Sequence, residues 1–280
     1  MKDIPYITDV VEFRIWATGD PCTFNTLEDD LRGAIDPNDY SEDLPQNVMD
    51  EIQGRQRMLE GSYPFECDGY SVRTRAGSIN TSTYLFCLGL TLLPPRFIES
   101  EQRSRQFETI AMNAAAGFFG GAALRIGAPW RDDETPDYRA LLKRVVGLIP
   151  ELGKNIRDAA PDGGDGGWDV LVVKDFKDRM IPRLIALGNC ATGLTNWKRK
   201  GKETEPDYIW TFFAHTPRSA ILTFFAVPFV MDEDARLRRI TASNMTFDRF
   251  RICEHAPESS RDVADWVEST RAAALEIPFN

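Results

Sequence analysis

The sequence predicts an α/β protein, because apolar β-type segments and segments with helical periodicity follow one another along its 280 residues. Two apolar segments, 168–176 and 183–190, are separated by about six residues and predict a β-hairpin. A third, 219–229, has the continuous apolar character of a buried strand. Helical patterns at 99–119 and 138–152 would flank these strands. We therefore expect a central mixed sheet of about four or five strands between helices.

Residues 1–97 are interpreted as an α+β N-terminal region. It carries two helical patterns, at 23–34 and 44–59, and a hairpin centred on the Asp68-Gly69 turn. The apolar segment 84–93 could be a buried helix or a buried strand, and its periodicity does not decide between them.

Residues 98–280 are interpreted as one domain that contains the central sheet. Besides the hairpin and the buried strand, it has a short strand pattern at 122–126 and an alternating segment at 247–252. The alternation of apolar and charged residues in the latter favours an exposed edge strand. A last helix is expected at 260–275.

The composition is that of an ordinary globular protein, with 42% hydrophobic and 27% charged residues. Its five cysteines include no C-x-x-C pair, so the sequence signals neither a disulfide framework nor a zinc site. The first residues carry no secretory signal, and the longest apolar run, 220–231, is shorter than the ~20 residues of a membrane helix. We therefore expect a cytoplasmic protein without a membrane partner. The net charge of −10 argues against a protein that coats nucleic acid by bulk electrostatics.

Three short motifs could carry chemistry, and they follow one another along the chain: Phe107-Glu108, Gly166-Gly167-Trp168-Asp169 and Asn189-Cys190-Ala191. Metal-dependent cleavage of a phosphodiester needs carboxylates that converge on a divalent cation, beside a polar or cationic group. In an antiparallel hairpin, Asp169 and Asn189 lie at the same end of the sheet, where Glu108 from a packed helix could join them. Taken singly, Asp169 could instead be a turn or strand-capping residue, and Glu108 an exposed glutamate.

The order and spacing of these motifs resemble the PD-(D/E)xK restriction-endonuclease superfamily. Within it they resemble the Mrr-like branch, which has a Phe-Glu helix, a Gly-Gly-x-Asp turn and a strand ending in Gln-Cys-Lys. The run from Asn189 to Trp197 also looks like a bacterial subgroup associated with phage-defence gene clusters. The resemblance implies a restriction-endonuclease-like core that binds Mg²⁺ or Mn²⁺ through Asp169, Glu108 and the backbone carbonyl of Cys190. Asn189 would complete that site.

The sequence departs from the family pattern at two positions. Asn189 stands where glutamine or glutamate is usual, and Ala191 stands where lysine is usual. An amide oxygen can still ligate a metal, but the alanine side chain has no polar atom. Either the chemistry is lost or the lysine has migrated. Lys198 and Lys200, just beyond the strand, are the candidates to replace it, and Lys174 on the first strand is the less favoured one.

The resemblance implies a divalent-metal-dependent DNA endonuclease, or a nuclease subunit, of a bacterial anti-phage defence system. DNA would contact a basic run that consists of Lys198, Arg199, Lys200 and Lys202. In most proteins such a run is simply a solvated loop. Because the net charge is negative, a second protein of the same defence operon would deliver the DNA or activate cutting. The alternative is a catalytically inactive nuclease-like fold that acts as a protein-binding or assembly module.

Other chemistries have less support in the sequence. A nucleophilic pair of Cys190 and His215 rests only on the presence of both residue types. The glycine-rich segments at 117–121 and 163–167 contain neither a phosphate-binding G-x-x-x-x-G-K-[ST] loop nor a dinucleotide-binding fingerprint. Intrinsic nucleotide hydrolysis is therefore not expected.

Overall fold

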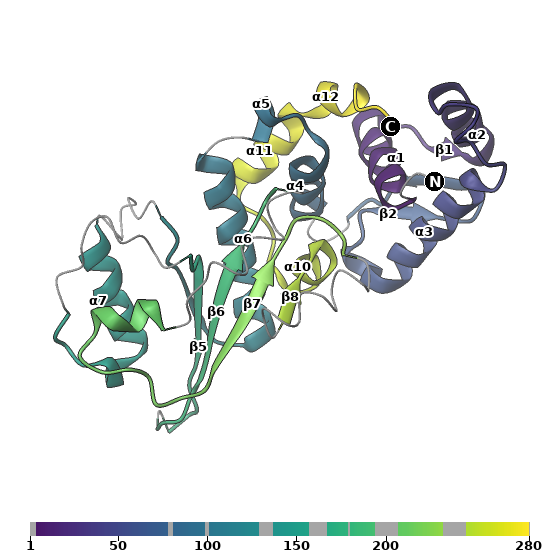
Figure 1. Cartoon of the computed structure of the whole chain (residues 1–280). Helices are drawn as coiled ribbons and strands as arrows, with labels where there is room; N and C mark the ends of the chain where they lie inside the picture. The colour runs from purple at the N-terminus through teal and green to yellow at the C-terminus, as the bar shows by residue number, and fades with distance from the viewer. Residues whose placement is uncertain are drawn as a thin grey trace. The chain divides into compact units, whose positions relative to one another are not determined.

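The computed structural model describes residues 4–77, 81–98, 101–128, 137–156, 167–178, 180–193, 207–231 and 245–279. Contacts divide the chain into two compact units (Figure 1). Unit 1 comprises Met1–Arg103, Pro228–Val230 and Pro257–Asn280, and unit 2 comprises Ser104–Val227 and Met231–Ala256. The sequence predicts domain limits of 1–97 and 98–280. The main difference is that Pro257–Asn280 belongs to unit 1, together with the N-terminal segment. No helix in the described part of the chain has the length and apolar character that a membrane crossing requires.

Unit 1 is mostly helical and carries one small antiparallel sheet, in the strand order β1-β3-β2. Its helices are α1 (Ile4–Thr18), α2 (Phe24–Ala34), α3 (Leu44–Leu59), α4 (Thr81–Leu92), α5 (Pro95–Ile98), α11 (Arg261–Ser269) and α12 (Arg271–Leu275). Its strands are β1 (Cys22–Thr23), β2 (Phe65–Cys67) and β3 (Ser71–Thr74). The predicted helices at 23–34 and 44–59 are confirmed, and so is the hairpin.

Local side-chain contacts explain why these elements begin and turn where they do. Thr23 caps α2, because its Oγ1 accepts a hydrogen bond from the Thr26 backbone N–H at 3.2 Å. In the β2–β3 turn, Asp68 Oδ1 accepts a hydrogen bond from the Ser71 backbone N–H at 2.8 Å. Gly69 takes a φ of 93°, in the region that favours glycine. Both signals are visible in the sequence.

The segment 84–93, which periodicity leaves open, forms most of helix α4. This helix is buried on nearly all sides, so its sequence is apolar all round rather than amphipathic. On one side it packs against α11, where the Phe86 and Trp266 ring centroids lie 5.0 Å apart. The indole also lies over Gly89, where a Cβ would come within 2.9 Å of the ring. The glycine therefore permits the close approach of the two helices.

The predicted helix at 260–275 is divided into α11 and α12, which meet at Thr270. Arg271 fixes α12 to α1, because its Nη1 donates a hydrogen bond to the Trp16 carbonyl at 2.7 Å. The same guanidinium lies 4.5 Å from the centre of the Trp16 ring. These contacts place the C-terminal helices with the N-terminal segment in unit 1.

Unit 2 is built on a five-stranded sheet in the order β4-β5-β6-β7-β8. Its strands are β4 (Ala122–Arg125), β5 (Val170–Lys174), β6 (Leu184–Cys190), β7 (Ile221–Ala226) and β8 (Met245–Phe247), and its helices are α6 (Glu101–Phe119), α7 (Tyr138–Leu148) and α10 (Arg249–His255). The first three strands are antiparallel neighbours, and β6, β7 and β8 run parallel. The predicted α/β class, the β5–β6 hairpin and the mixed sheet are confirmed.

Helices cover both faces of this sheet, with α7 on one side and α6 and α10 on the other (Figure 1). On the α6 face, Phe119 packs near Phe224 of β7 and Phe247 of β8, with ring centroids 6.2 Å and 6.3 Å away. On the α7 face, Leu171 and Leu187 belong to a buried apolar cluster. Its α7 members are Leu141, Leu142 and Val145. Both faces of the sheet are thus buried, as expected where parallel strands are present.

The alternating segment 247–252 is not a strand, and this corrects the sequence-based expectation. Strand β8 ends at Phe247, and Asp248 caps α10 by accepting a hydrogen bond from the Arg251 backbone N–H at 3.2 Å. Asp248 and Arg249 are both fully buried, so the charged residues of this segment do not lie on an exposed edge. The pattern was misleading because Asp248 is a helix-capping residue whose neighbours face the interior.

Candidate functional site

Three strand ends meet at one edge of the unit 2 sheet, where β4 and β6 end and β5 begins. Asp169, directly ahead of β5, lies at the centre of this edge. Its backbone N–H donates to the Gly188 carbonyl of β6 at 2.8 Å, and its carbonyl accepts from the backbone N–H of Ile126 at 2.7 Å. The hairpin thus brings Asp169 beside the end of β6, as the sequence predicts.

Two carboxylates converge beside Gly127, which follows β4. A Cβ on Gly127 would lie 2.8 Å from Asp169 Oδ1 and 3.0 Å from Glu108 Oε2. Both acids are 8% exposed, so the reading of Glu108 as an exposed glutamate is wrong. Glycine at position 127 therefore lets the two carboxylate oxygens approach the same backbone position, one from helix α6 and one from the residue before β5.

Backbone and side-chain donors hold the two carboxylates in place. Asp169 Oδ2 accepts a hydrogen bond from the Cys190 backbone N–H at 2.6 Å. Glu108 Oε2 lies 3.1 Å from Arg125 Nη1, which also donates to the Gly127 carbonyl at 2.7 Å. The side chains of Arg125 and Glu108 are only 13% and 10% exposed. The two charges are therefore partly desolvated, and the electrostatic attraction between them is stronger than between two exposed charges.

Asn189 faces the same edge and has one unsatisfied atom. Its Nδ2 donates to the Gly167 carbonyl, whereas its Oδ1 is buried and has no hydrogen-bond partner among the residues that the structure describes. A buried amide oxygen without a donor costs free energy, which suggests that a donor or a cation belongs there. Ala191 continues the sheet, with its N–H bonded to the Ala226 carbonyl at 3.0 Å, and contributes no polar side chain.

These residues fit a hard divalent cation in part. Such a cation prefers carboxylate, amide and carbonyl oxygens, which Asp169, Glu108, Asn189 and the carbonyl of Cys190 could provide. The approach of both carboxylates to Gly127 and the unsatisfied Asn189 Oδ1 are the two observations that favour this fit. Among the described residues, no group of three or more His, Cys, Asp or Glu side chains could hold a metal ion. A cation here would therefore depend on neutral oxygen ligands as well.

Three lysines were candidates to replace the one that is usual at position 191. Lys174 is not near this end of the sheet, and Lys198 and Lys200 lie outside the described residues. Lys174 ends β5, and its ammonium donates to the Gly120 carbonyl, at the opposite end of the strand from Asp169. It is therefore excluded as a replacement. The basic run is outside the described residues, and its proposed role stays a prediction: Lys198, Arg199, Lys200 and Lys202.

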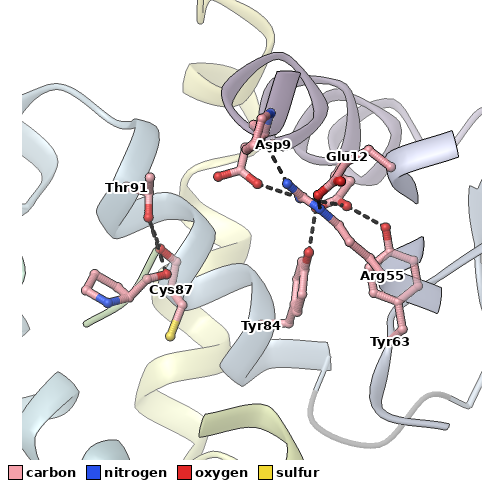
Figure 2. Close-up of polar contacts among 10 residues, drawn as sticks. Asp9, Glu12, Arg55, Tyr63, Tyr84, Cys87 and Thr91 are labelled. Carbon is pink, nitrogen blue, oxygen red and sulfur yellow. Dashed lines mark hydrogen bonds and ion pairs between the residues drawn. The ribbon is translucent and has the colours of Figure 1, made fainter. Parts of the chain in front are cut away.

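A second polar cluster, in unit 1, was not foreseen from the sequence (Figure 2). Arg55 of α3 is fully buried, and its Nη1 lies 2.6 Å from Asp9 Oδ1 and 3.0 Å from Glu12 Oε1, both on α1. Its Nε pairs with Glu51 at 2.9 Å, and its Nη2 donates to the Pro5 carbonyl at 3.1 Å. We call these residues, with the two tyrosines described next, the Arg55 cluster.

Two phenols complete the cluster around Glu12. Tyr63 donates to Glu12 Oε1, and Tyr84 donates to Glu12 Oε2 at 2.7 Å. Burial by itself lowers the pKa of Arg55, but Glu12 and Asp9 outweigh it, so the pKa is raised well above its usual value. Burial, followed by the charge of Glu12, raises the pKa of Tyr63 well above its usual value. The cluster joins α1, α3 and α4 from inside, so it is a structural brace of unit 1.

The raised pKa of Tyr63 predicts a loss of stability in alkali. Below pH ~10 the phenol is protonated in both the folded and the unfolded chain. Above that pH the unfolded chain releases the proton while folded Tyr63 keeps it, so the free energy of unfolding falls by up to ~1.4 kcal/mol per pH unit. Urea denaturation between pH 8 and pH 11 measures how the free energy of unfolding depends on pH. Tyr63→Phe should make this dependence weaker by the contribution of one titrating proton. An equal slope in the variant would contradict the buried phenol.

Comparisons with known proteins add one distant likeness. Neither a family model nor a curated protein matches the chain. Among solved structures, the chain is similar to the MspJI restriction endonuclease in complex with a 27-mer oligonucleotide, with 13% sequence identity and a TM-score of 0.31. The match covers 72% of this chain and 36% of that chain.

Proposed function

We propose that unit 2 is a divalent-metal-dependent DNA nuclease, acting as the nuclease subunit of a bacterial anti-phage defence system. The observation that carries the proposal is the convergence of the Asp169 and Glu108 carboxylates beside Gly127. The unsatisfied Oδ1 of Asn189 at the same edge supports it. The order of these residues in the sequence, which resembles that of the PD-(D/E)xK nucleases, supports the choice of a phosphodiester as substrate.

In this proposal the chain's residues hold the cation and orient the phosphate. Asp169, fixed by the Cys190 N–H, and Glu108, whose Oε2 is paired with Arg125, would be the anionic ligands. Asn189 Oδ1 and the Cys190 carbonyl would complete the oxygen set. When bound, Mg²⁺ or Mn²⁺ would supply an activated water and neutralise charge on the phosphate. The burial of both carboxylates strengthens their interaction with any bound charge, because the local dielectric constant is low.

Delivery of the DNA would require help, because the chain carries a net charge of −10. Favourable association with DNA depends on the release of counterions by clustered cations. The basic run at 198–202 is the segment that would make such contacts, and a second protein of the same defence operon would supply the rest of the binding surface.

The test is cleavage of plasmid and linear DNA by the full chain with Mg²⁺ or Mn²⁺, in the presence and absence of candidate partner proteins. Asp169→Asn keeps an oxygen for the Cys190 N–H but removes the charge. We expect it to lower the cleavage rate by at least ~100-fold, the usual effect of losing one preorganised charged group. Calorimetric titration with Mn²⁺ should show weaker binding in the same variant.

The matched control is Asp178→Asn, which removes an exposed aspartate at the far end of the β5–β6 hairpin. It should cut and bind Mn²⁺ like the unaltered protein. Cleavage that persists in EDTA, or that is equal in the two variants, would contradict a metal site at Asp169. If the protein neither cuts DNA with any partner nor binds Mn²⁺, the inactive assembly module becomes the better account of unit 2.

A further inference from the structure

We propose that Arg125 is the phosphate-binding residue of the candidate site and supplies the cationic group that Ala191 lacks. The inference rests on the proposed function and assigns a role to a residue that the sequence motifs do not include. Arg125 ends strand β4, and its guanidinium contacts Glu108, one of the two converging carboxylates, at 3.1 Å. A phosphate held by a cation at those carboxylates would lie next to this guanidinium.

The backbone fixes Arg125 relative to the carboxylates. In the sheet register Arg125 is opposite Val170, the residue after Asp169. Beyond this pair, the Asp169 carbonyl accepts hydrogen bonds from the N–H groups of Ile126 and Gly127, at 2.7 Å and 3.1 Å. The end of β4 is thus tied to the residue that carries one of the carboxylates. Arg125 is therefore held at the site by strand pairing rather than by a flexible loop.

A lysine at position 191 would either position the attacking water or stabilise negative charge on the phosphate. Arginine suits the second of these roles. Its guanidinium stays protonated at all physiological pH values, so it cannot accept a proton from water. It can instead donate two parallel hydrogen bonds to phosphate oxygens, which a lysine ammonium cannot do. Arg125 would therefore stabilise the negative charge that develops on the phosphate, whereas the activation of water would depend on the cation alone.

The contact with Glu108 predicts that Arg125 and a metal ion compete for the same oxygen. With Asp169 and Glu108 ionised, the guanidinium cancels one of the two negative charges beside Gly127. A cation that binds Glu108 would release Nη1 from Oε2, and this donor could then turn to the phosphate while Nη1 keeps its hydrogen bond to the Gly127 carbonyl. Removal of the arginine should therefore strengthen metal binding while it weakens phosphate binding. A residue that only braced the fold would not produce these opposite changes.

The experiment compares Arg125→Gln and Arg125→Lys with the control Arg218→Gln. Arg218 is exposed and lies near the start of β6, at the other end of the sheet from Asn189. Two quantities are measured on the full chain: the Kd for Mn²⁺ by calorimetry, and the Kd for a fluorescein-labelled DNA duplex by anisotropy, with Ca²⁺ as the bound cation. We expect Arg125→Gln to bind Mn²⁺ roughly tenfold more tightly and DNA at least roughly tenfold more weakly. Cleavage, where it is observed, should fall by ~100-fold.

Arg125→Lys decides the matter if Arg125→Gln proves too unstable to measure. It keeps the charge, so its affinity for Mn²⁺ should stay within about threefold of the original, while the loss of the planar fork weakens DNA binding. If both Arg125 variants bind DNA and Mn²⁺ like Arg218→Gln, this inference is wrong even though Asp169→Asn abolishes cleavage. If the unaltered protein binds no Mn²⁺ and cuts no DNA, the proposed function itself fails.

Discussion

Replacement of Arg55 by methionine is expected to destabilise unit 1 by about 3–5 kcal/mol. The guanidinium is fully buried and pairs with Asp9 and Glu12, whose side chains are 6% and 0% exposed. Methionine fills a similar volume but leaves both carboxylates buried without their cation. Such an uncompensated charge costs far more than the loss of an exposed pair. Urea denaturation at pH 7, followed by tryptophan fluorescence and circular dichroism, measures the effect.

Arg32→Met is the matched control for this prediction. Arg32 pairs with Glu28 at 2.7 Å, but the two side chains are 61% and 36% exposed. Water screens such a surface pair, so it contributes little to stability and the control should unfold at nearly the original urea concentration. A loss below ~1 kcal/mol in Arg55→Met would show that the cluster is hydrated rather than buried. Combining Arg55→Met with Asp9→Asn and Glu12→Gln should recover part of the lost stability.

Replacement of Gly188 by alanine is expected to destabilise unit 2 by about 1–3 kcal/mol or more. Gly188 lies in the middle of the sheet, opposite Val170 and Phe224. A Cβ at this position would overlap the Phe224 ring, which covers the glycine. The ring cannot move freely, because it packs between Phe119 and Phe247. The backbone N–H of Asp169 donates a hydrogen bond to the Gly188 carbonyl, so the candidate site should be disturbed as well.

The control is Gly147→Ala, in the last turn of helix α7. Among the described residues, no atom outside its immediate neighbours and the surrounding helix backbone lies within 4 Å of a Cβ built on Gly147. Alanine restricts the unfolded chain and favours the helix, so this variant should gain up to ~1 kcal/mol. Thermal and urea unfolding of the two variants should therefore shift in opposite directions. Equal stability of Gly188→Ala and the unaltered protein would mean that the sheet accommodates a side chain at that position.

Elements with local signals were predictable from the sequence alone. The helices α2 and α3 combine amphipathic spacing with start signals such as Thr23, and the β2–β3 hairpin has its Asp68-Gly69 turn. The β5–β6 hairpin follows from two apolar segments with a short connection. Each of these signals lies within a few residues of the element that it specifies. That is why the α/β class and the central sheet could be read without a structure.

Elements whose character depends on distant packing were not predictable in this way. Helix α1 has apolar and β-branched residues on most sides, because it is buried by other segments of unit 1, and its sequence has no clear helical periodicity. The segment 247–252 alternates like a strand, yet Asp248 begins a helix. Thr270 divides a continuous helical pattern where the chain passes from α11 to α12, which packs on α1. Tertiary contacts decided each of these outcomes.

The sequence by itself determined the fold class and the order of the acids that border the candidate site. Only the tertiary structure revealed that Asp169 and Glu108 converge beside Gly127. It also revealed that the guanidinium of Arg125 contacts one of these carboxylates. It likewise revealed the Arg55 cluster, whose Arg55 and Asp9 are 46 positions apart. The physical reason is the same in each case. Periodicity and turn signals act over a few neighbouring residues, whereas ion pairs and close approaches depend on distances that strand pairing and helix packing alone establish.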